Sequence, residues 1–352
     1  MFNYIFGEII ILLEIFIVIY IVNYYYRYFT RPNPLPGPFP LPYIGSSFQI
    51  LYKLFKAGRY QFDLGLYAKL QAEEYGEISE MYQGSLRSIF LNKSEFLEKV
   101  YLANTNTSYF IRPVANGMNE FDVGHGTIFN NDRKSWKRFR KYISQSLMSP
   151  KFLRGLTITV QQLFEENEYR LNDHDDQRII NLTNWTKYFL KDLSKEIITG
   201  QKGCCLASLN LKESKWTNEM KEARGSLKGI ELFFRSITFF TSVPKFVRHY
   251  FPIFNSYHNY FLNSLTSFQN EILCKIKERR EQIEQTSGNV GFNLLDTLLT
   301  VGTPRDPNFD HNDTDEPLTD LELRDNIFDL TIAGDSVCQF SFLNFTIFFL
   351  QS

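Results

Sequence analysis

Residues 318–336 read LTDLELRDNIFDLTIAGDS, and this stretch carries the strongest fold signal in the chain. Thr319, followed three residues later by Glu322, forms a capping box, the pattern that opens a helix. No proline occurs in residues 319–350, so one helix of about 50 Å is possible at 1.5 Å per residue. The sequence therefore predicts a long final helix that carries, side by side, a glycine, an acid and a hydroxyl: Gly334, Asp335 and Ser336.

The remainder of the chain reads as mainly α with a small β-sheet near its amino-terminal end. Residues 77–91 alternate around Gly84 as a short β-hairpin would. Residues 105–127, rich in Asn, Gly and Pro, predict a long loop, and residues 302–317 a second one with three prolines. Helices are expected at 59–75, 94–103, 132–147, 151–171, 184–199, 212–230, 244–285 with breaks, and 293–299.

Composition excludes some functional classes. The 352 residues hold 38 Lys and Arg against 39 Asp and Glu, a net charge of -1, which argues against a nucleic-acid binder. The 4 cysteines are too few for a disulfide scaffold and form no Cys-x-x-Cys pair. The 5 histidines show no ligand spacing, so surface or structural roles are expected for them.

The amino terminus predicts a single transmembrane anchor, residues 1–26. Residues 5–22 are almost entirely apolar, close to the roughly 20 residues that a span needs. Tyrosines follow where an interfacial belt would lie, and then Arg27 and Arg31, so the positive-inside rule places the bulk of the chain in the cytoplasm. A cleaved signal peptide is the alternative, but it would require a basic residue before the apolar run and a small-residue cleavage site after it.

A proline-rich hinge, residues 27–46, separates this anchor from the globular part, residues 47–352. Six prolines fall within residues 31–45, and each one restricts its own φ and that of the residue before it. The segment predicts a semi-rigid spacer rather than a helix. A generic linker or an SH3-type ligand is the alternative reading.

A basic helix over residues 132–141 carries the clearest binding pattern. Trp136 and Arg140 are four residues apart and therefore share one helical face. An indole N–H beside a guanidinium forms a donor pair suited to a carboxylate. The remaining basic residues of this helix are expected to face solvent.

Taken in order, these features resemble the cytochrome P-450 family of haem-thiolate monooxygenases, in its microsomal, membrane-anchored, fungal-like type. The resemblance covers about residues 5–334 and rests on the anchor, the Pro36-Gly37-Pro38 hinge, the Trp136–Arg140 helix and the Ala333-Gly334 helix. It implies a truncated cytochrome P-450 fold behind a single transmembrane helix, in the endoplasmic reticulum membrane. The implied cofactor is haem b, with electrons from NADPH arriving through a cytochrome reductase, and the implied substrate is an apolar small molecule.

The resemblance also implies roles for individual residues. In the family, the Trp-x-x-x-Arg pair binds a haem propionate, a role that falls here on Trp136 and Arg140. Gly334 would open the oxygen groove, and Asp335 and Ser336 would relay protons. The fit to the family motif fails after Gly334, however, because an ungapped alignment puts Ser336 in place of the acid and leaves no hydroxyl at the next two positions.

The axial cysteine that binds iron in the family is not found in this sequence. No Glu-x-x-Arg pair and no Phe-x-x-Gly-x-Arg-x-Cys-x-Gly segment occurs, and residues 200–204 imitate only part of the latter, so they are interpreted as a helix end and a turn. Without a thiolate, the iron lacks the electron donation that favours O–O cleavage. We therefore expect this chain to be inactive by itself. The alternative hypothesis is a haem-free, membrane-anchored helical protein that binds lipids or partners.

Overall fold

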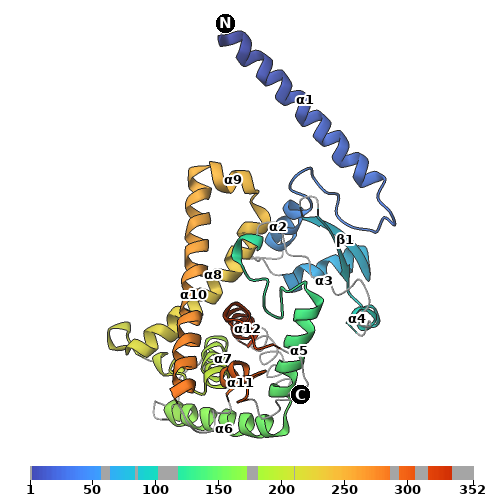
Figure 1. The fold of residues 1–352 in the computed structure, drawn as a ribbon. Coiled ribbons are helices and arrows are strands. Elements are labelled where there is room, and N and C mark those ends of the chain that lie inside the picture. Colours follow the sequence, from blue (N-terminus) through green and yellow to red (C-terminus); the bar gives the residue numbers. More distant parts are fainter. Residues whose placement is uncertain are drawn as a thin grey trace. The chain divides into compact units, whose positions relative to one another are not determined.

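The structure is a computed structural model that describes residues 2–56, 64–83, 86–101, 118–172, 181–209, 211–285, 293–305 and 316–334. The chain divides into two compact units, residues 1–110 and 111–352. Within the described residues the protein is mainly helical with one small sheet, as the sequence predicts (Figure 1).

The first unit begins with a long apolar helix, α1 (Phe2–Phe29). Its segment Ile10–Phe29 is long and apolar enough to cross a membrane, and it is the one described segment that meets both criteria. The helix continues through the tyrosine cluster and past residue 26, the limit expected for the anchor. It ends just before Arg31-Pro32, because the residue before a proline disfavours helical geometry.

The first three residues of the proline-rich hinge, 27–29, belong to α1, whereas residues 30–46 contain no helix and are held against the first strand. Glu80 lies at the centre, with Arg31 Nη2 2.6 Å from one carboxylate oxygen and Arg87 Nη2 2.6 Å from the other. Arg87 also donates to the carbonyls of Pro32 and Asn33, at 2.8 Å and 2.6 Å. The predicted stiff spacer is thus anchored to the sheet by an arginine–carboxylate cluster.

The remaining elements of the first unit are short. The predicted hairpin is confirmed as β1 (Ile78–Gln83) and β2 (Leu86–Leu91), antiparallel with Ile78 opposite Leu91. The predicted helices beside it are confirmed over residues 64–75 and 94–101, and their remaining predicted residues, 59–63 and 102–103, lie outside the described residues. The sequence reading missed one helix, α2. The helices are α2 (Ser47–Lys56), α3 (Leu64–Tyr75) and α4 (Ser94–Tyr101).

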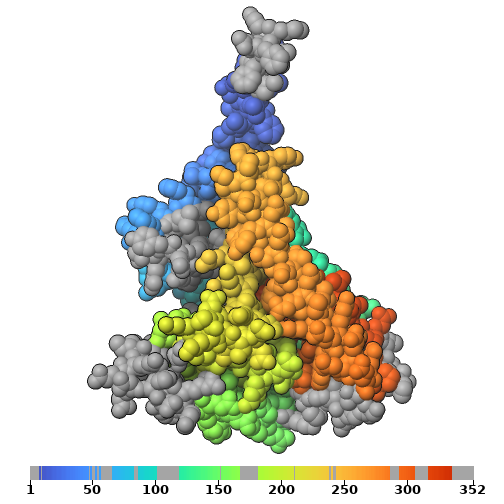
Figure 2. All heavy atoms as spheres, turned by 90° about the vertical axis from the view of Figure 1, so that its left-hand side faces the viewer, coloured from blue at the N-terminus to red at the C-terminus, as the bar shows by residue number. Residues whose placement is uncertain are grey.

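The second unit is a bundle of helices around α12 (Asp320–Ile332), which runs through its middle beside α5, α7, α10 and α11 (Figure 1). Buried aromatic rings, among them Phe139, Phe240 and Phe328, fill its core. Helices α8 and α10 lie side by side on one face (Figure 2). The other elements are η2 (Met118–Phe121), α5 (Arg133–Leu147), α6 (Pro150–Asn172), α7 (Leu182–Thr199), η3 (Leu206–Ser208), η4 (Glu213–Lys215), α8 (Asn218–Ser242), α9 (Lys245–Tyr250), α10 (Pro252–Gln285) and α11 (Leu294–Thr300).

Most predicted helices of this unit are confirmed to within two or three residues, but one is wrong in its limits. The helix expected over 212–230 begins at Asn218, where the Thr217 hydroxyl caps it, and it continues to Ser242. The break expected within 244–285 falls at Phe251-Pro252. Of the long final helix, the structure describes the part up to Gly334, and residues 335–350 lie outside the described residues.

Candidate functional site

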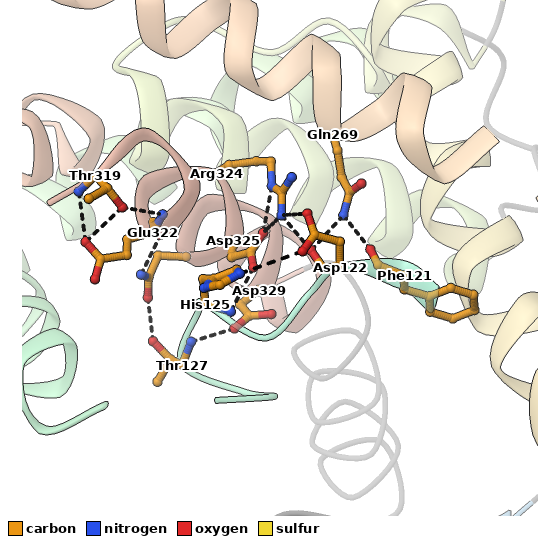
Figure 3. Close-up of polar contacts among 11 residues, drawn as sticks. Phe121, Asp122, His125, Thr127, Gln269, Thr319, Glu322, Arg324, Asp325 and Asp329 are labelled. Atoms are coloured by element: carbon orange, nitrogen blue, oxygen red, sulfur yellow. Dashed lines mark hydrogen bonds and ion pairs between the residues drawn. The ribbon is translucent and has the colours of Figure 1, made fainter. Parts of the chain in front are cut away.

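Two buried carboxylates on α12, one helical turn apart, organise the loop that leads into α5 (Figure 3). Asp325 accepts the backbone N–H of His125 at 2.9 Å. Asp329 accepts those of Thr127 and Ile128, both at 2.7 Å and at the same oxygen. Hydrogen bonds to an ionised acceptor are shorter and about twice as strong as neutral ones. The loop 125–128 is therefore held on α12 by three of its backbone N–H groups, and the Thr127 hydroxyl adds a side-chain bond to Asn326 Oδ1 at 2.6 Å.

Gly126 lies in the middle of this contact, where no side chain fits. A Cβ built on it would come 2.3 Å from Asp329 Oδ2 and 2.8 Å from the Asp325 carbonyl oxygen. Because one of these neighbours is backbone, it has little freedom to move away. The close approach explains why glycine occupies this position.

The same loop is joined to α12 by Arg324, a buried cation (Figure 3). Its Nε donates to Asp325 at 2.7 Å, and its Nη2 reaches the carbonyl of Asp122 at 2.5 Å. Burial raises the pKa of Asp325, although the His125 N–H and the Arg324 guanidinium oppose the rise. Asp122 adopts a positive φ of 49°, and Gln269 of α10 donates to the adjacent Phe121 carbonyl at 3.0 Å. Segment 121–128 is thus fixed from two helices.

Helix α5 is joined to α12 by a second polar contact. Asp132 caps the amino end of α5 by accepting from the backbone of Lys134 and Ser135. Arg138 forms an ion pair with Glu322, which also completes the predicted capping box with Thr319. Arg138 is half-buried, so the expectation that it faces solvent is wrong, whereas Lys134, Lys137 and Lys141 are exposed. The physical reason is the carboxylate on the facing helix, which the sequence of α5 alone does not reveal.

Trp136 and Arg140, the predicted propionate pair, are in different environments. Trp136 is half-buried, and its indole N–H donates to the Thr127 carbonyl at 3.1 Å. Arg140, one turn further on, is exposed and forms no ion pair with a residue in the described ranges. The Trp136 indole is thus already bonded to the loop, whereas the Arg140 guanidinium faces solvent. The role of this pair in binding haem stays a prediction.

The predicted oxygen-groove glycine lies where the final helix changes its hydrogen bonding. The helix is π-type at Ala333 and Gly334, a local widening that is frequent at functional sites. A Cβ added at Gly334 would come 3.3 Å from Ser194 Cβ of α7, so packing between helices also favours glycine there. Asp335 and Ser336 lie outside the described residues, and their predicted proton relay stays a prediction.

The three described cysteines are free thiols. Cys205 is fully buried in the turn after α7, and its N–H donates to Asp192 at 2.7 Å. Burial raises the pKa of the neighbouring Cys204 thiol. Gly200 ends α7 in the left-handed conformation, φ 71°, so the interpretation of residues 200–204 as a helix end and a turn is confirmed. Cys274 is exposed on α10.

Sequence reasoning missed one cluster of titratable groups. Glu120 of η2, His249 of α9 and His258 of α10 place their ligand-type atoms within 4.8 Å of one another. The histidines are nine residues apart and the glutamate is far away in sequence, so no spacing rule would have found them.

Comparison with known proteins agrees with the fold. The family model for cytochrome P450 matches residues 35–337, which is most of the chain and includes α5, α12 and the loop 125–128. No protein in the curated set matches. On the ordered elements and this match, the chain belongs to the cytochrome P450 family.

Proposed function

We propose that this protein serves as a membrane-anchored, haem-dependent monooxygenase, an oxidoreductase that inserts one oxygen atom from O2 into an organic substrate. The observation that carries the proposal is the family match over residues 35–337 together with the α5–loop–α12 assembly inside it. Haem b would supply activation of dioxygen when bound. The chain's own residues would bind and orient this group and would deliver protons.

The donor set on α5 fits the propionate end of haem. Arg140 is exposed and offers a planar guanidinium fork that suits a carboxylate. The Trp136 indole has one N–H, so it would have to exchange the Thr127 carbonyl for a propionate oxygen. The loop 125–128 would keep its position meanwhile, because its backbone amides are held by Asp325 and Asp329.

The iron end has no protein ligand among the described cysteines. Cys205 is fully buried beside Asp192, and Cys274 is exposed on α10. Burial raises the pKa of the Cys204 thiol, so its thiolate form is disfavoured. The 352-residue sequence also contains no Phe-x-x-Gly-x-Arg-x-Cys-x-Gly segment. We therefore propose that the monooxygenase activity requires an axial ligand that these 352 residues do not supply, and that by themselves they hold haem weakly and do not turn over substrate.

Gly334, Asp335 and Ser336 are proposed to handle oxygen and protons. Glycine keeps the helix surface open, and an acid beside an alcohol can pass a proton while excluding bulk water. The change to π-type hydrogen bonding at Ala333 and Gly334 supports this position as a site of altered helix geometry.

The partners are proposed from charge and hydropathy. Helix α1 would anchor the protein in the endoplasmic reticulum membrane with its globular part in the cytoplasm. A pocket is lined by four basic residues, Lys134, Lys137, Arg138 and Lys141, and by two acidic ones, Asp132 and Glu322. Its excess of positive charge suits an acidic partner, such as an NADPH-dependent cytochrome reductase. An apolar small molecule is the proposed substrate.

Haem uptake by the full chain in detergent tests the proposal. Trp136→Phe keeps an aromatic side chain but removes the indole N–H, and Arg140→Leu removes the guanidinium. Each should weaken haem binding about tenfold or more, since a hydrogen bond to a charged group contributes about 1.5–3 kcal/mol. Lys137→Leu, an exposed basic residue of the same helix, is the matched control and should bind haem normally. Equal haem affinity in all three variants would refute the assignment.

A haem-free protein that binds lipids or partners is the second candidate. The engaged indole N–H of Trp136 favours it, because the donor is satisfied without a cofactor. No haem-dependent absorbance at any haem concentration, together with normal partitioning into vesicles, would support this second function.

A further inference from the structure

We infer that Glu120, His249 and His258 form a binding site for one divalent transition-metal ion, best matched by Zn²⁺. The three residues belong to different elements of the second unit, η2, α9 and α10. Their ligand-type atoms lie within 4.8 Å of one another. Two imidazoles and one carboxylate form a ligand set that binds zinc in proteins and leaves a fourth position open.

The separations suit a tetrahedral ion after small side-chain adjustments. The distance from Glu120 Oε2 to His258 Nε2 is 2.7 Å, and the distance to His249 Nε2 is 4.0 Å. Zn–N and Zn–O bonds of about 2.0 Å place tetrahedral ligand atoms about 3.3 Å apart. The two observed distances lie on either side of this value, each within about 0.7 Å of it.

A chain of amide hydrogen bonds determines which nitrogen of His258 carries a proton. The His249 carbonyl, which only accepts, receives a bond from Asn255 Nδ2 at 3.3 Å. Asn255 Oδ1 therefore receives one from Asn259 Nδ2, at 3.0 Å, which leaves Asn259 Oδ1 facing His258 Nδ1 at 3.3 Å. An amide oxygen only accepts hydrogen bonds, so this contact favours hydrogen on Nδ1, and a neutral His258 then presents the lone pair of Nε2.

That lone pair faces a carboxylate, an arrangement that requires a cation between them. Arg248 binds the other oxygen of Glu120, with Nη2 2.9 Å from Oε1. A second proton on His258 or a metal ion would meet the requirement.

The position of His249 favours the metal over the proton. Its ring lies edge-on to that of His258, with centroids 4.7 Å apart, and its Nε2 lies 4.0 Å from the same carboxylate oxygen. A proton shared by Glu120 and His258 gives His249 no role, whereas a metal ion uses it as the third ligand. His249 is 36% exposed, so an ion can enter from solvent and keep a water molecule at the open position. Asn259 would then be the outer partner that orients a ligating imidazole.

A bound ion would join η2 to the α9–α10 turn. Because η2 continues directly into Asp122, which contacts Arg324 of α12, the ion would stabilise the segment that positions the loop 125–128. Arg248 would reduce the affinity by partly neutralising Glu120. These consequences do not depend on haem.

Zinc binding by the full chain in detergent micelles tests the inference. Competition against a chromophoric chelator should show one Zn²⁺ per chain, and Co²⁺ should give the intense visible absorption of a tetrahedral ion. His249→Ala and Glu120→Gln should each lower the affinity at least tenfold, and Asn259→Leu about 10–100-fold, the usual effect of removing an outer partner. Zn²⁺ should raise the thermal midpoint of the wild type but not that of His249→Ala.

His125→Ala is the matched control, because His125 is also half-exposed and also lies near a carboxylate, 3.7 Å from Asp122. Its affinity for zinc should equal that of the wild type. His249 is exposed, so His249→Ala should leave the fold intact. This variant therefore keeps the test valid even if a substitution of the buried His258 prevents folding. Zinc affinity unchanged by His249→Ala, or ¹⁵N spectra in which both His258 nitrogens stay protonated in the presence of Zn²⁺, would overturn the metal site in favour of the proton.

Discussion

Gly126→Ala should destabilise the second unit more than any other glycine-to-alanine change in the loop before α5. The added Cβ would come 2.3 Å from Asp329 Oδ2, the atom that accepts the N–H groups of Thr127 and Ile128. Either the carboxylate or the loop must move, and both bonds lengthen or break. Hydrogen bonds to charged groups contribute about 1.5–3 kcal/mol each, so losing two costs about 3–6 kcal/mol. Alanine recovers about 0.4–1 kcal/mol by restricting the unfolded chain, which leaves a net loss of about 2–6 kcal/mol.

Urea unfolding followed by tryptophan fluorescence measures this loss directly. The three tryptophans, Trp136, Trp185 and Trp216, all belong to the second unit, so the signal reports on the unit that contains the mutation. A loss of this size is a large share of the roughly 5–15 kcal/mol that stabilises a typical protein.

Gly124→Ala is the control in the same loop. A Cβ at Gly124 has no neighbour within 4 Å, so its free energy of unfolding should change by less than about 1 kcal/mol. Equal stability of the two variants would refute the reasoning, because it would mean that the carboxylate and the loop separate without cost.

Three further predictions concern Glu322 and Asp325 of α12 and Gly225 of α8. Glu322→Ala should destabilise the protein by about 1 kcal/mol more than Glu322→Gln in urea unfolding, because glutamine preserves the capping box with Thr319 while both variants lose the ion pair with Arg138. Asp325→Asn should flatten the pH dependence of stability, because burial raises the folded-state pKa of Asp325. The contribution of this group to the free energy of unfolding is fully present below about pH 3.9, the pKa of an unfolded Asp, and is lost as pH rises through the folded-state pKa. The wild type should therefore gain stability over the variant as pH falls, and a pH-independent difference would contradict this. Gly225→Ala should stabilise α8 by about 0.5–1 kcal/mol, since this exposed helical glycine has open space around its Cα, and a lower thermal midpoint would count against it.

Local features of this protein follow from its sequence. The capping box at Thr319 and Glu322, the left-handed helix end at Gly200 and the hairpin over residues 78–91 all form as expected. Each depends on residues close together in the chain, so its geometry is set by backbone stereochemistry and short-range hydrogen bonds. The apolar helix α1 belongs to the same class, because hydropathy and length alone define it.

Contacts between distant residues were decided by tertiary structure alone. Glu322 was predicted as a cap but also pairs with Arg138 from α5, and Asp325 and Asp329 bind backbone amides about 200 residues earlier in the chain. Glu120 joins His249 and His258 only because η2, α9 and α10 pack together. A carboxylate in the sequence carries no sign of which distant donor it will face, since that depends on how the helices pack and on the cost of burying a charge without a partner. The sequence thus determined where most of the helices and turns form, with α2 and the limits of α8 as the exceptions, and the packing of the second unit determined which charges meet.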